Sequence, residues 1–186
     1  MAPAPVAMRA AKRHELAAIQ DIESAADTVF RCAAMPWVLA MPPADLEILE
    51  TARRRGHLRV AVDRADTPIG FALLSTLGGE AFLHQLSVVP RHAGRGVGGA
   101  LLEAACAIAR DEGRASVALS TALGVPWNAP FYARRGFVVV PPRDYTAAMR
   151  RERAHEMRMG HPAWRRCFMR RALDAAGAPN PGASAL

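Results

Sequence analysis

The feature that most constrains this chain is a glycine-rich segment between two strongly patterned stretches. Residues 94–99 read Gly-Arg-Gly-Val-Gly-Gly. Residues 81–89 before them alternate like a strand, and residues 97–112 carry apolar side chains at helical spacing. The pattern predicts a strand, a glycine loop and a helix. The first turn of that helix offers unpaired N–H groups and the positive end of the helix dipole. Glycine lets an anion approach closely, so the loop has the properties of a diphosphate-binding site.

Other kinds of glycine loop have a similar composition. The surrounding sequence excludes two of them, the dinucleotide-binding loop and the Walker loop. The string matches the dinucleotide fingerprint GxGxxG, but that fingerprint needs an acidic residue at the end of the next strand, where Ser120-Thr121 stand here. Too little chain follows to complete a doubly wound sheet. A phosphate loop of the Walker type needs a lysine that is absent. A tight turn that only packs a helix against a sheet stays open on the loop alone.

The order of the other elements indicates an α/β domain. Short turns join the predicted strands 58–62, 69–77 and 81–89, so we expect antiparallel pairing. Helix 97–112 leads to a strand at 115–120, which implies a parallel crossover. We further predict helices at 12–26, 45–55 and 129–135, strands at 6–10, 137–140 and 166–171, and an irregular segment at 31–41. One domain should cover residues 1–172, and the Ala-, Gly- and Pro-rich residues 173–186 should be disordered.

Composition and charge limit the class of protein. The chain is 51% hydrophobic and 22% charged, as in ordinary globular proteins. We find no membrane-spanning or secretory segment, no disulfide framework among three scattered cysteines and no metal-ligand spacing, so we predict a cytoplasmic protein without a metal. The net charge of +7 favours a phosphate-bearing partner, either a cofactor or a nucleic acid. For the arginine-rich residues 143–171 we favour a solvated helical face over a nucleic-acid surface.

Two segments together resemble the GNAT superfamily of N-acetyltransferases. The first runs from Leu86 through the glycine loop to Leu102, and the second is Trp127–Phe137 with its Asn…Phe-Tyr…Gly-Phe pattern. The resemblance covers the second half of the chain closely and the first half only by element order. It implies a mixed, mainly antiparallel, splayed sheet flanked by helices. It also implies direct transfer of acetyl from acetyl-coenzyme A to a primary amine in a ternary complex.

The resemblance assigns residues to the cofactor. The pantetheine arm should lie in the gap of the sheet, with its amides paired to the backbone of Leu86 and Val88, and Asn128 should also bind this arm. The diphosphate should rest on Gly94, Arg95, Gly96, Val97, Gly98 and Gly99. The family usually has Gln or Arg where this chain has Ala93. Either Arg91 or Arg95 then supplies the missing contact, or the affinity for the cofactor is weaker.

The resemblance also places Tyr132 near the sulfur, where its phenol can protonate the departing thiolate. Tyr132 and Asn128 are four residues apart, so they share a face of the predicted helix. In the alternative interpretation, Asn128 only caps the helix and Tyr132 only packs its ring in the core.

A general base is harder to assign from the sequence. Related sequences often carry a glutamate where Gln85 stands, and an amide cannot take the proton. His84 can, although as the neighbour in a strand it should point to the opposite face. Glu80 is a weaker candidate, and a water relay or an amine that arrives neutral would remove the need for a base.

The sequence does not identify the acceptor amine, which is either a small molecule or a peptide. Trp37 and Trp127 either line an acceptor pocket or only hold an irregular segment in place by hydrophobic packing. A second hypothesis is a regulatory domain that binds acetyl-coenzyme A without turnover, since the glutamate is missing. A third, which we do not favour, is an arginine-rich nucleic-acid binder. The oligomeric state stays open, with a homodimer as one option.

Overall fold

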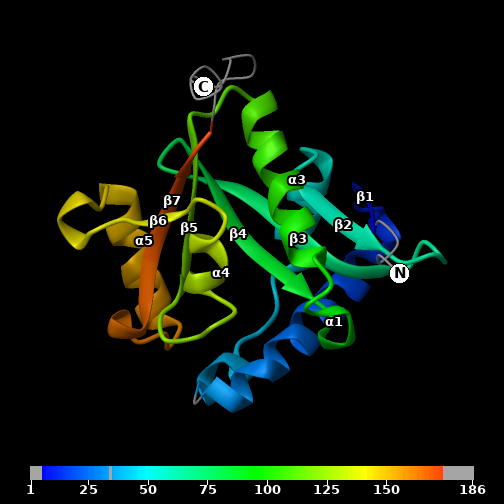
Figure 1. Ribbon diagram of the computed structural model, residues 1–186, viewed down its shortest axis with the longest axis horizontal. Helices are drawn as coiled ribbons and strands as arrows, with labels where there is room; N and C mark the ends of the chain where they lie inside the picture. Colours follow the sequence, from blue (N-terminus) through cyan, green and yellow to red (C-terminus); the bar gives the residue numbers. More distant parts are fainter. Residues whose placement is uncertain (1–5, 34, 174–186) are drawn as a thin grey trace, which may run out of the picture.

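The computed structural model describes residues 6–33 and 35–173, and it contains a seven-stranded sheet in the order β1-β2-β3-β4-β5-β7-β6 (Figure 1). The strands are β1 Ala7–Ala10, β2 Leu58–Val62, β3 Pro68–Leu77, β4 Glu80–Val88, β5 Ser116–Ala122, β6 Val138–Val139 and β7 Arg166–Ala172. The helices are α1 Leu16–Asp27, α2 Leu46–Arg54, α3 Val97–Asp111, α4 Ala129–Ala133 and α5 Ala147–Arg158. The predicted irregular segment consists of two 3₁₀ turns, Thr28–Ala33 and Pro36–Ala40.

The strand pairing confirms the predicted fold class. Strands β1 to β4 pair with their neighbours in antiparallel fashion, while β4 and β5 are parallel and joined by the crossover helix α3. The last strand, β7, inserts between β5 and β6 and runs antiparallel to both. The sequence predicted each of these strands, but not the position of β7 between two earlier ones.

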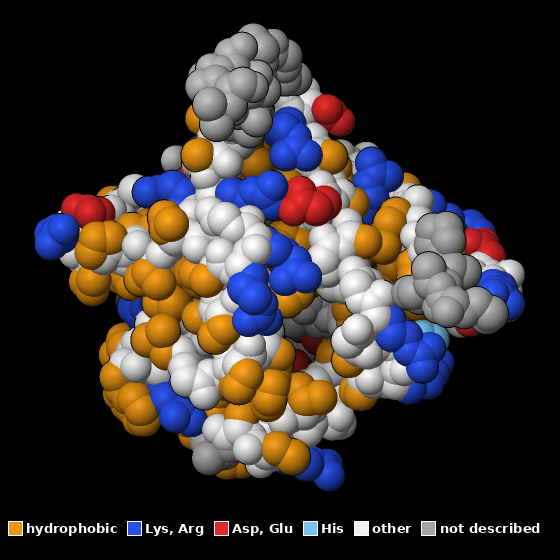
Figure 2. Space-filling view, in the orientation of Figure 1, with side chains coloured by type: hydrophobic (Ala, Val, Ile, Leu, Met, Phe, Trp, Pro, Cys, Tyr) orange, Lys and Arg blue, Asp and Glu red, His pale blue; other side chains and the backbone are white. Residues whose placement is uncertain are grey.

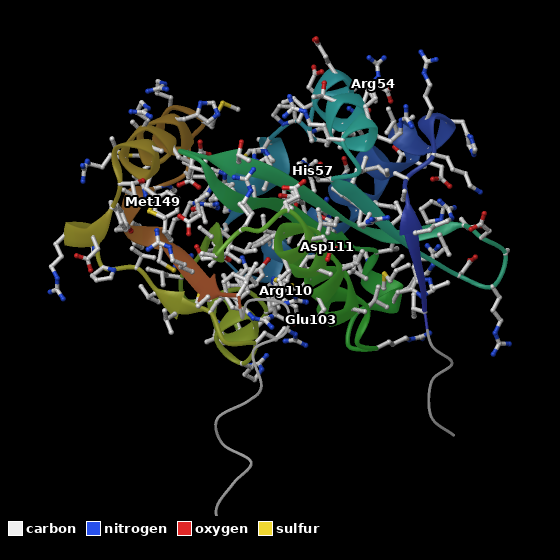
Figure 3. All side chains as sticks on the ribbon, turned by 90° about the horizontal axis from the view of Figure 1, so that it is seen from above. Arg54, His57, Glu103, Arg110, Asp111 and Met149 are labelled. Carbon is white, nitrogen blue, oxygen red and sulfur yellow. The ribbon has the colours of Figure 1, made fainter. Side chains whose placement is uncertain are left out.

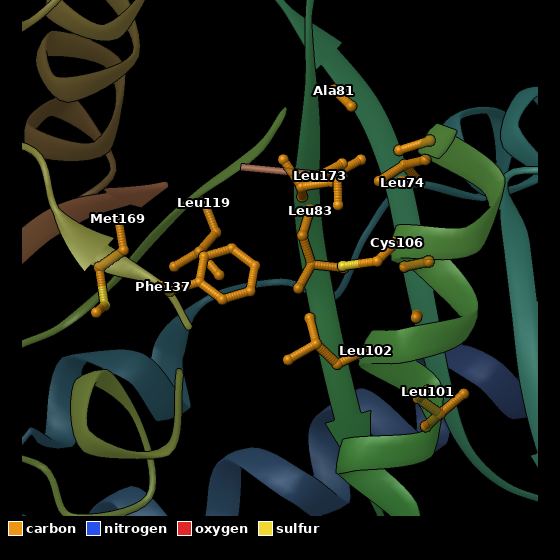
Figure 4. Close-up of a cluster of buried hydrophobic side chains, with 14 of the residues drawn as sticks. Leu74, Ala81, Leu83, Leu101, Leu102, Cys106, Leu119, Phe137, Met169 and Leu173 are labelled. Carbon is orange, nitrogen blue, oxygen red and sulfur yellow. The ribbon is translucent and has the colours of Figure 1, made fainter. Parts of the chain in front are cut away.

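Helices cover both faces of the sheet. Helix α3 packs on one face, and α1, α2 and α5 pack on the other, as the separation of Arg54 and Met149 from Glu103 and Arg110 shows (Figure 3). The larger core lies under α3 (Figure 4). Its members include Leu74, Leu83, Leu101, Leu102, Cys106, Leu119, Phe137 and Met169. Cys106 is fully buried there, as expected of a packing residue.

Local capping explains where two helices begin. The Asp45 carboxylate accepts the backbone N–H of Glu47 at 2.7 Å and starts α2. The Thr146 hydroxyl accepts the N–H of Met149 at 3.1 Å and starts α5. Met149 and Glu156 of α5 are buried. The basic segment 143–171 therefore also contributes to the protein interior, whereas the sequence predicted only a solvated helical face.

Leu173 follows directly after the predicted domain boundary and lies within the described residues. Its N–H donates to the carbonyl of Ala115 at 2.8 Å and its side chain is buried. Residues 174–186 of the predicted tail lie outside the described residues. Within the described ranges, every helix is too short or too polar to cross a bilayer.

Candidate active site

The sheet opens where β4 and β5 part. These strands pair only through Ala81–Leu83 and Val117–Leu119, and they diverge beyond that point (Figure 1). Residues 85–88 of β4 keep their pairing with β3 on the other edge. The edge of β4 that faces β5 therefore carries backbone N–H and C=O groups without a strand partner, in the position predicted for Leu86 and Val88. Such an edge can pair with an extended amide-bearing ligand.

A bulge marks the same point on β4. Leu73 of β3 is opposite Gln85, and the next residue, Leu74, is opposite Leu83, so His84 is an extra residue. Before the bulge Leu83 packs under α3, and after it Leu86 and Val88 pack on that same face. His84 and Gln85 consequently share the opposite face, and the expectation that they point to opposite faces is wrong. Strict alternation fails because the bulge adds one residue.

A cavity of about 990 Å³ fills the gap between the diverging strands. Its walls come from the ends of β4 and β5, the glycine loop, α4, α1 and the two 3₁₀ turns. Figure 2 shows a recess in the middle of this face of the molecule, with basic side chains beside it. Among the predicted site residues, those that line the cavity are His84, Leu86, Val88, Gly94, Gly96, Gly98, Gly99, Asn128 and Tyr132.

The glycine loop presents its backbone to the cavity. Gly94 and Gly96 have φ of +73° and +82°, a conformation that side chains rarely adopt, and Gly96 is the residue just before α3. The helix N-terminus therefore opens onto the cavity without side chains in the way. Val97 is 2% exposed and packs in the core, so only its backbone can serve a ligand.

The expected replacements for the missing side chain at Ala93 do not line the cavity. Arg91 and Arg95 are exposed outside its wall, and Arg91 Nε lies 3.2 Å from His92 Nε2. The side chains with basic groups that do line this end are His92, Arg134 and Arg135.

Arg135 is a site residue that sequence reasoning missed. Its guanidinium stacks on the Phe131 ring at 3.9 Å and donates to the Phe131 carbonyl at 3.0 Å. A Cβ on Gly99 would lie 3.0 Å from that guanidinium, so this glycine leaves room for Arg135 against the first turn of α3. The available signal was the four-residue spacing of Phe131 and Arg135 on one helix.

Tyr132 of α4 and Asn128, the residue before this helix, both line the cavity. The Tyr132 ring packs edge-on against Phe131 and Phe137, and burial raises its pKa above the usual value, so the phenol stays protonated at neutral pH. Asn128 precedes α4, but its side chain makes no capping hydrogen bond. The capping alternative therefore does not account for Asn128.

His84 is exposed to the cavity, and its ring packs edge-on against Phe82 at 6.4 Å. The surrounding protein removes water and lowers the pKa of His84, and smaller effects come from nearby charges on Glu152, His155, Glu156 and Arg166. The imidazole is neutral at pH 7 and can accept a proton.

The weaker candidate for a base, Glu80, is held away from the cavity by its contacts. Glu80 lies at the far end of β4, where it accepts bonds from Arg170 at 2.6 Å and from Ser116 at 2.7 Å. Glu80 does not line the cavity. The Gln85 amide lines it and donates to the Ser87 hydroxyl at 3.1 Å.

The end of the cavity formed by α1 carries two carboxyl groups that the sequence did not single out as site residues. Glu23 and Asp27 are four residues apart on α1 and both line the cavity. Burial, and then the charge of Glu23, raise the pKa of Asp27 to about 7. Burial also raises the pKa of Glu23, opposed by a hydrogen bond from the Ala44 N–H at 3.0 Å.

The two tryptophans have different roles. Trp127 lines the cavity and packs edge-on against Phe30 with ring centroids 6.3 Å apart. Trp37 does not line it, and packs instead against a small cluster that contains Met35 and Val38. The pocket prediction thus holds for Trp127, and the packing interpretation holds for Trp37.

A splayed sheet, a glycine loop at a helix N-terminus and a tyrosine in the same cavity define an acyltransferase that works on a thioester. The sequence model of the acetyltransferase (GNAT) family matches residues 17–137. The chain belongs to this family, which confirms the resemblance and the class of enzyme.

Solved structures share the fold at low sequence identity. The PaiA N-acetyltransferase from Thermoplasma acidophilum, in complex with coenzyme A, is 16% identical with a TM-score of 0.64, covering 91% of this chain and 99% of that one. A GNAT-family acetyltransferase from Staphylococcus aureus Mu50 is 16% identical with a TM-score of 0.67, covering 91% and 99%. N-acetylglutamate synthase from Neisseria gonorrhoeae, complexed with coenzyme A and N-acetyl-glutamate, is 18% identical with a TM-score of 0.66, covering 92% of this chain and 36% of that one. Coenzyme A in two of these structures agrees with acetyl-coenzyme A as the co-substrate.

Proposed function

We propose that this enzyme transfers acetyl from acetyl-coenzyme A to a primary amine by direct attack within a ternary complex. The observation that carries the proposal is the convergence on one cavity of three features from separate parts of the chain. These are the unpaired edge of β4, the glycine loop and Tyr132. Tyr132, which lines the cavity as a protonated phenol, favours a catalytic role over the regulatory alternative.

The cofactor would bind along the gap between β4 and β5. The pantetheine amides would pair with the backbone of Leu86 and Val88, and Asn128 would hold the same arm. The diphosphate would accept backbone N–H groups from the loop Gly94–Gly99, where the helix dipole also favours negative charge. Arg135, stacked beside Gly99, would add a charge-assisted hydrogen bond that Ala93 cannot supply.

The chemistry follows from the groups at the opening of the sheet. The neutral amine nitrogen attacks the thioester carbonyl carbon, the C–N bond forms, and the C–S bond then breaks. Backbone N–H groups of β4 near Val88 would stabilise the negative charge on the carbonyl oxygen. His84 would take the proton from the new ammonium, directly or through water. Tyr132 would give its proton to the departing thiolate and regain one from solvent.

Thiol release with an amine panel tests the proposal. Tyr132→Phe should lower kcat by about a hundredfold, the scale of a lost general acid, while the Kd for acetyl-coenzyme A stays close to that of the wild type. Tyr145→Phe is the matched control, because Tyr145 packs against Phe168 outside the cavity. His84→Gln should remove the acidic limb of the kcat/KM profile below pH 6.5. Cofactor binding without turnover on any amine would instead favour a regulatory domain.

The cellular location is part of the same proposal. We place the enzyme in the cytoplasm because its three cysteines are free thiols, with Cys106 and Cys167 buried and Cys32 exposed. Acetylation activity confined to a membrane or secreted fraction would count against this location.

A further inference from the structure

The two ends of the cavity carry opposite charge. Arg134 and Arg135 line the end beside the glycine loop, and Arg166 lines the cavity from β7, where it pairs with Glu156 at 2.9 Å. Glu23 and Asp27 line the end beside α1, and they are the only carboxylates among the described lining residues. Figure 2 shows acidic side-chain atoms, in red, deep inside the recess. The phosphate-binding end accounts for Arg134 and Arg135, and Glu156 neutralises Arg166, whereas nothing in acetyl-coenzyme A calls for the carboxylates.

The acidic pair is unusual in this arginine-rich chain because it lacks a cationic partner. Other buried carboxylates are neutralised: Glu15 contacts Arg9 at 2.6 Å, and Glu156 contacts Arg166 at 2.9 Å. Within residues 6–33 and 35–173, neither Glu23 nor Asp27 forms an ion pair. One oxygen of Glu23 accepts the Ala44 N–H, which fixes the carboxylate at the cavity wall. Two carboxyl groups thus lie close together in a poorly hydrated place, which disfavours their charged forms, and a bound cation would relieve this cost.

Part of the cavity wall is apolar. Phe30, Met35 and Val38 line the cavity on the side of the 3₁₀ turns, and Trp127 faces Phe30. Such walls suit a hydrocarbon linker, and aromatic faces tolerate a cation passing along them.

We propose that the acceptor is a linear amine with a second positive charge, of the diamine or polyamine class, whose distal ammonium binds between Glu23 and Asp27. This inference rests on the proposed function, because it assigns the substrate class for the same cavity. One nitrogen attacks the thioester while the other stays protonated at the α1 end. An acceptor with a carboxylate at the distal position would meet like charges there and be rejected.

Three amines test the role of the distal charge, because they share a four-carbon chain and differ in the group at its far end. Putrescine ends in an ammonium, butylamine in a methyl group and γ-aminobutyrate in a carboxylate. We expect kcat/KM for putrescine to exceed that for butylamine by about tenfold to a hundredfold, the range of one charge-assisted hydrogen bond, with γ-aminobutyrate the poorest. Asp27→Asn and Glu23→Gln should each lower the putrescine-to-butylamine ratio about tenfold. Asp21→Asn is the matched control, because Asp21 is exposed on the same helix and outside the cavity.

A binding measurement keeps the inference testable without turnover. Putrescine should raise the melting temperature of the coenzyme A complex more than butylamine does, and Asp27→Asn should abolish the difference. Equal or better acetylation of butylamine or γ-aminobutyrate would overturn the inference and leave the proposed function standing. Failure to acetylate any of the three, together with no thermal shift by putrescine, would overturn the inference. An acetyl-coenzyme A complex that then proved inert toward every other amine would sink the proposed function as well.

Discussion

Replacing Asp27 by Asn should stabilise the protein at neutral and higher pH. The asparagine side chain has nearly the same shape but carries no charge into the cavity. Burial raises the pKa of Asp27 from 3.8 to about 7. At 1.36 kcal/mol per pH unit, ionising this carboxyl in the folded protein costs roughly 4 kcal/mol more than in the free side chain. Asp27 is only half-buried in an open cavity, so water screens part of this effect. We expect about 2 kcal/mol of added stability near pH 8.

The sign of the pH dependence follows from the direction of the shift. The folded state binds the Asp27 proton more tightly than the unfolded chain does. The contribution of Asp27 to the free energy of unfolding of the wild type is therefore fully present below about pH 4. It is lost as the pH rises through about 7, the folded-state value. The Asn variant has no such loss. The advantage of the variant should therefore grow between about pH 5 and pH 8.

Thermal melts across that pH range provide the assay. For a chain of this length, about 2 kcal/mol corresponds to a rise of roughly 4–8 °C in melting temperature near pH 8. The rise should be much smaller near pH 5, and Asp21→Asn should show no pH-dependent gain. A variant that is less stable than the wild type at pH 8, or equally shifted at both pH values, would refute the reasoning. Either result would mean that the Asp27 carboxylate is well solvated or paired in solution.

Two further predictions test the cofactor end of the site and the packing behind it. Arg135→Leu should weaken coenzyme A binding by about tenfold, measured by calorimetry, because a charge-assisted hydrogen bond to phosphate is lost. Arg91→Leu, outside the cavity wall, is the control, and equal losses in both variants would contradict the assignment to Arg135. Gly70→Ala should destabilise the fold by about 1–3 kcal/mol, since its Cβ would lie 2.9 Å from the Ser87 carbonyl oxygen on the neighbouring strand. Gly98→Ala, whose Cβ would lie 3.5 Å from Phe131, should melt close to the wild type, and the comparison fails if the two variants melt alike.

Much of the fold could be predicted because it is encoded locally. The alternation of residues 58–62 and 69–77, and the helical spacing after the glycine loop, fix backbone periodicity without reference to distant residues. The positive φ at Gly94 and Gly96 is likewise a local requirement that only glycine meets easily. The predicted elements therefore agree with the observed ones to within a few residues.

The bulge at His84 lay beyond local patterns. Alternation predicted that His84 and Gln85 face opposite sides, but the register with β3 inserts an extra residue and places both toward one side. The parting of β4 from β5 after Leu83 and Leu119 is also a property of pairing between distant strands. Neither the bulge nor the divergence of the strands can be predicted from one strand alone, because the sequence of a strand does not specify which strand it pairs with.

The sequence by itself determined most of the order of elements, the glycine loop before α3 and the placing of Asn128 and Tyr132 in one short segment, since each depends on a short stretch of backbone. Only the tertiary structure decided which charges meet in the cavity. It paired Glu80 with Arg170 away from the cavity, brought Arg135 to the glycine loop, and placed Glu23 and Asp27 in one cavity with no ion-pair partner among the described residues. The energy of a charge depends on its burial and on its neighbours in space, and these are set by the packing of segments far apart in the chain.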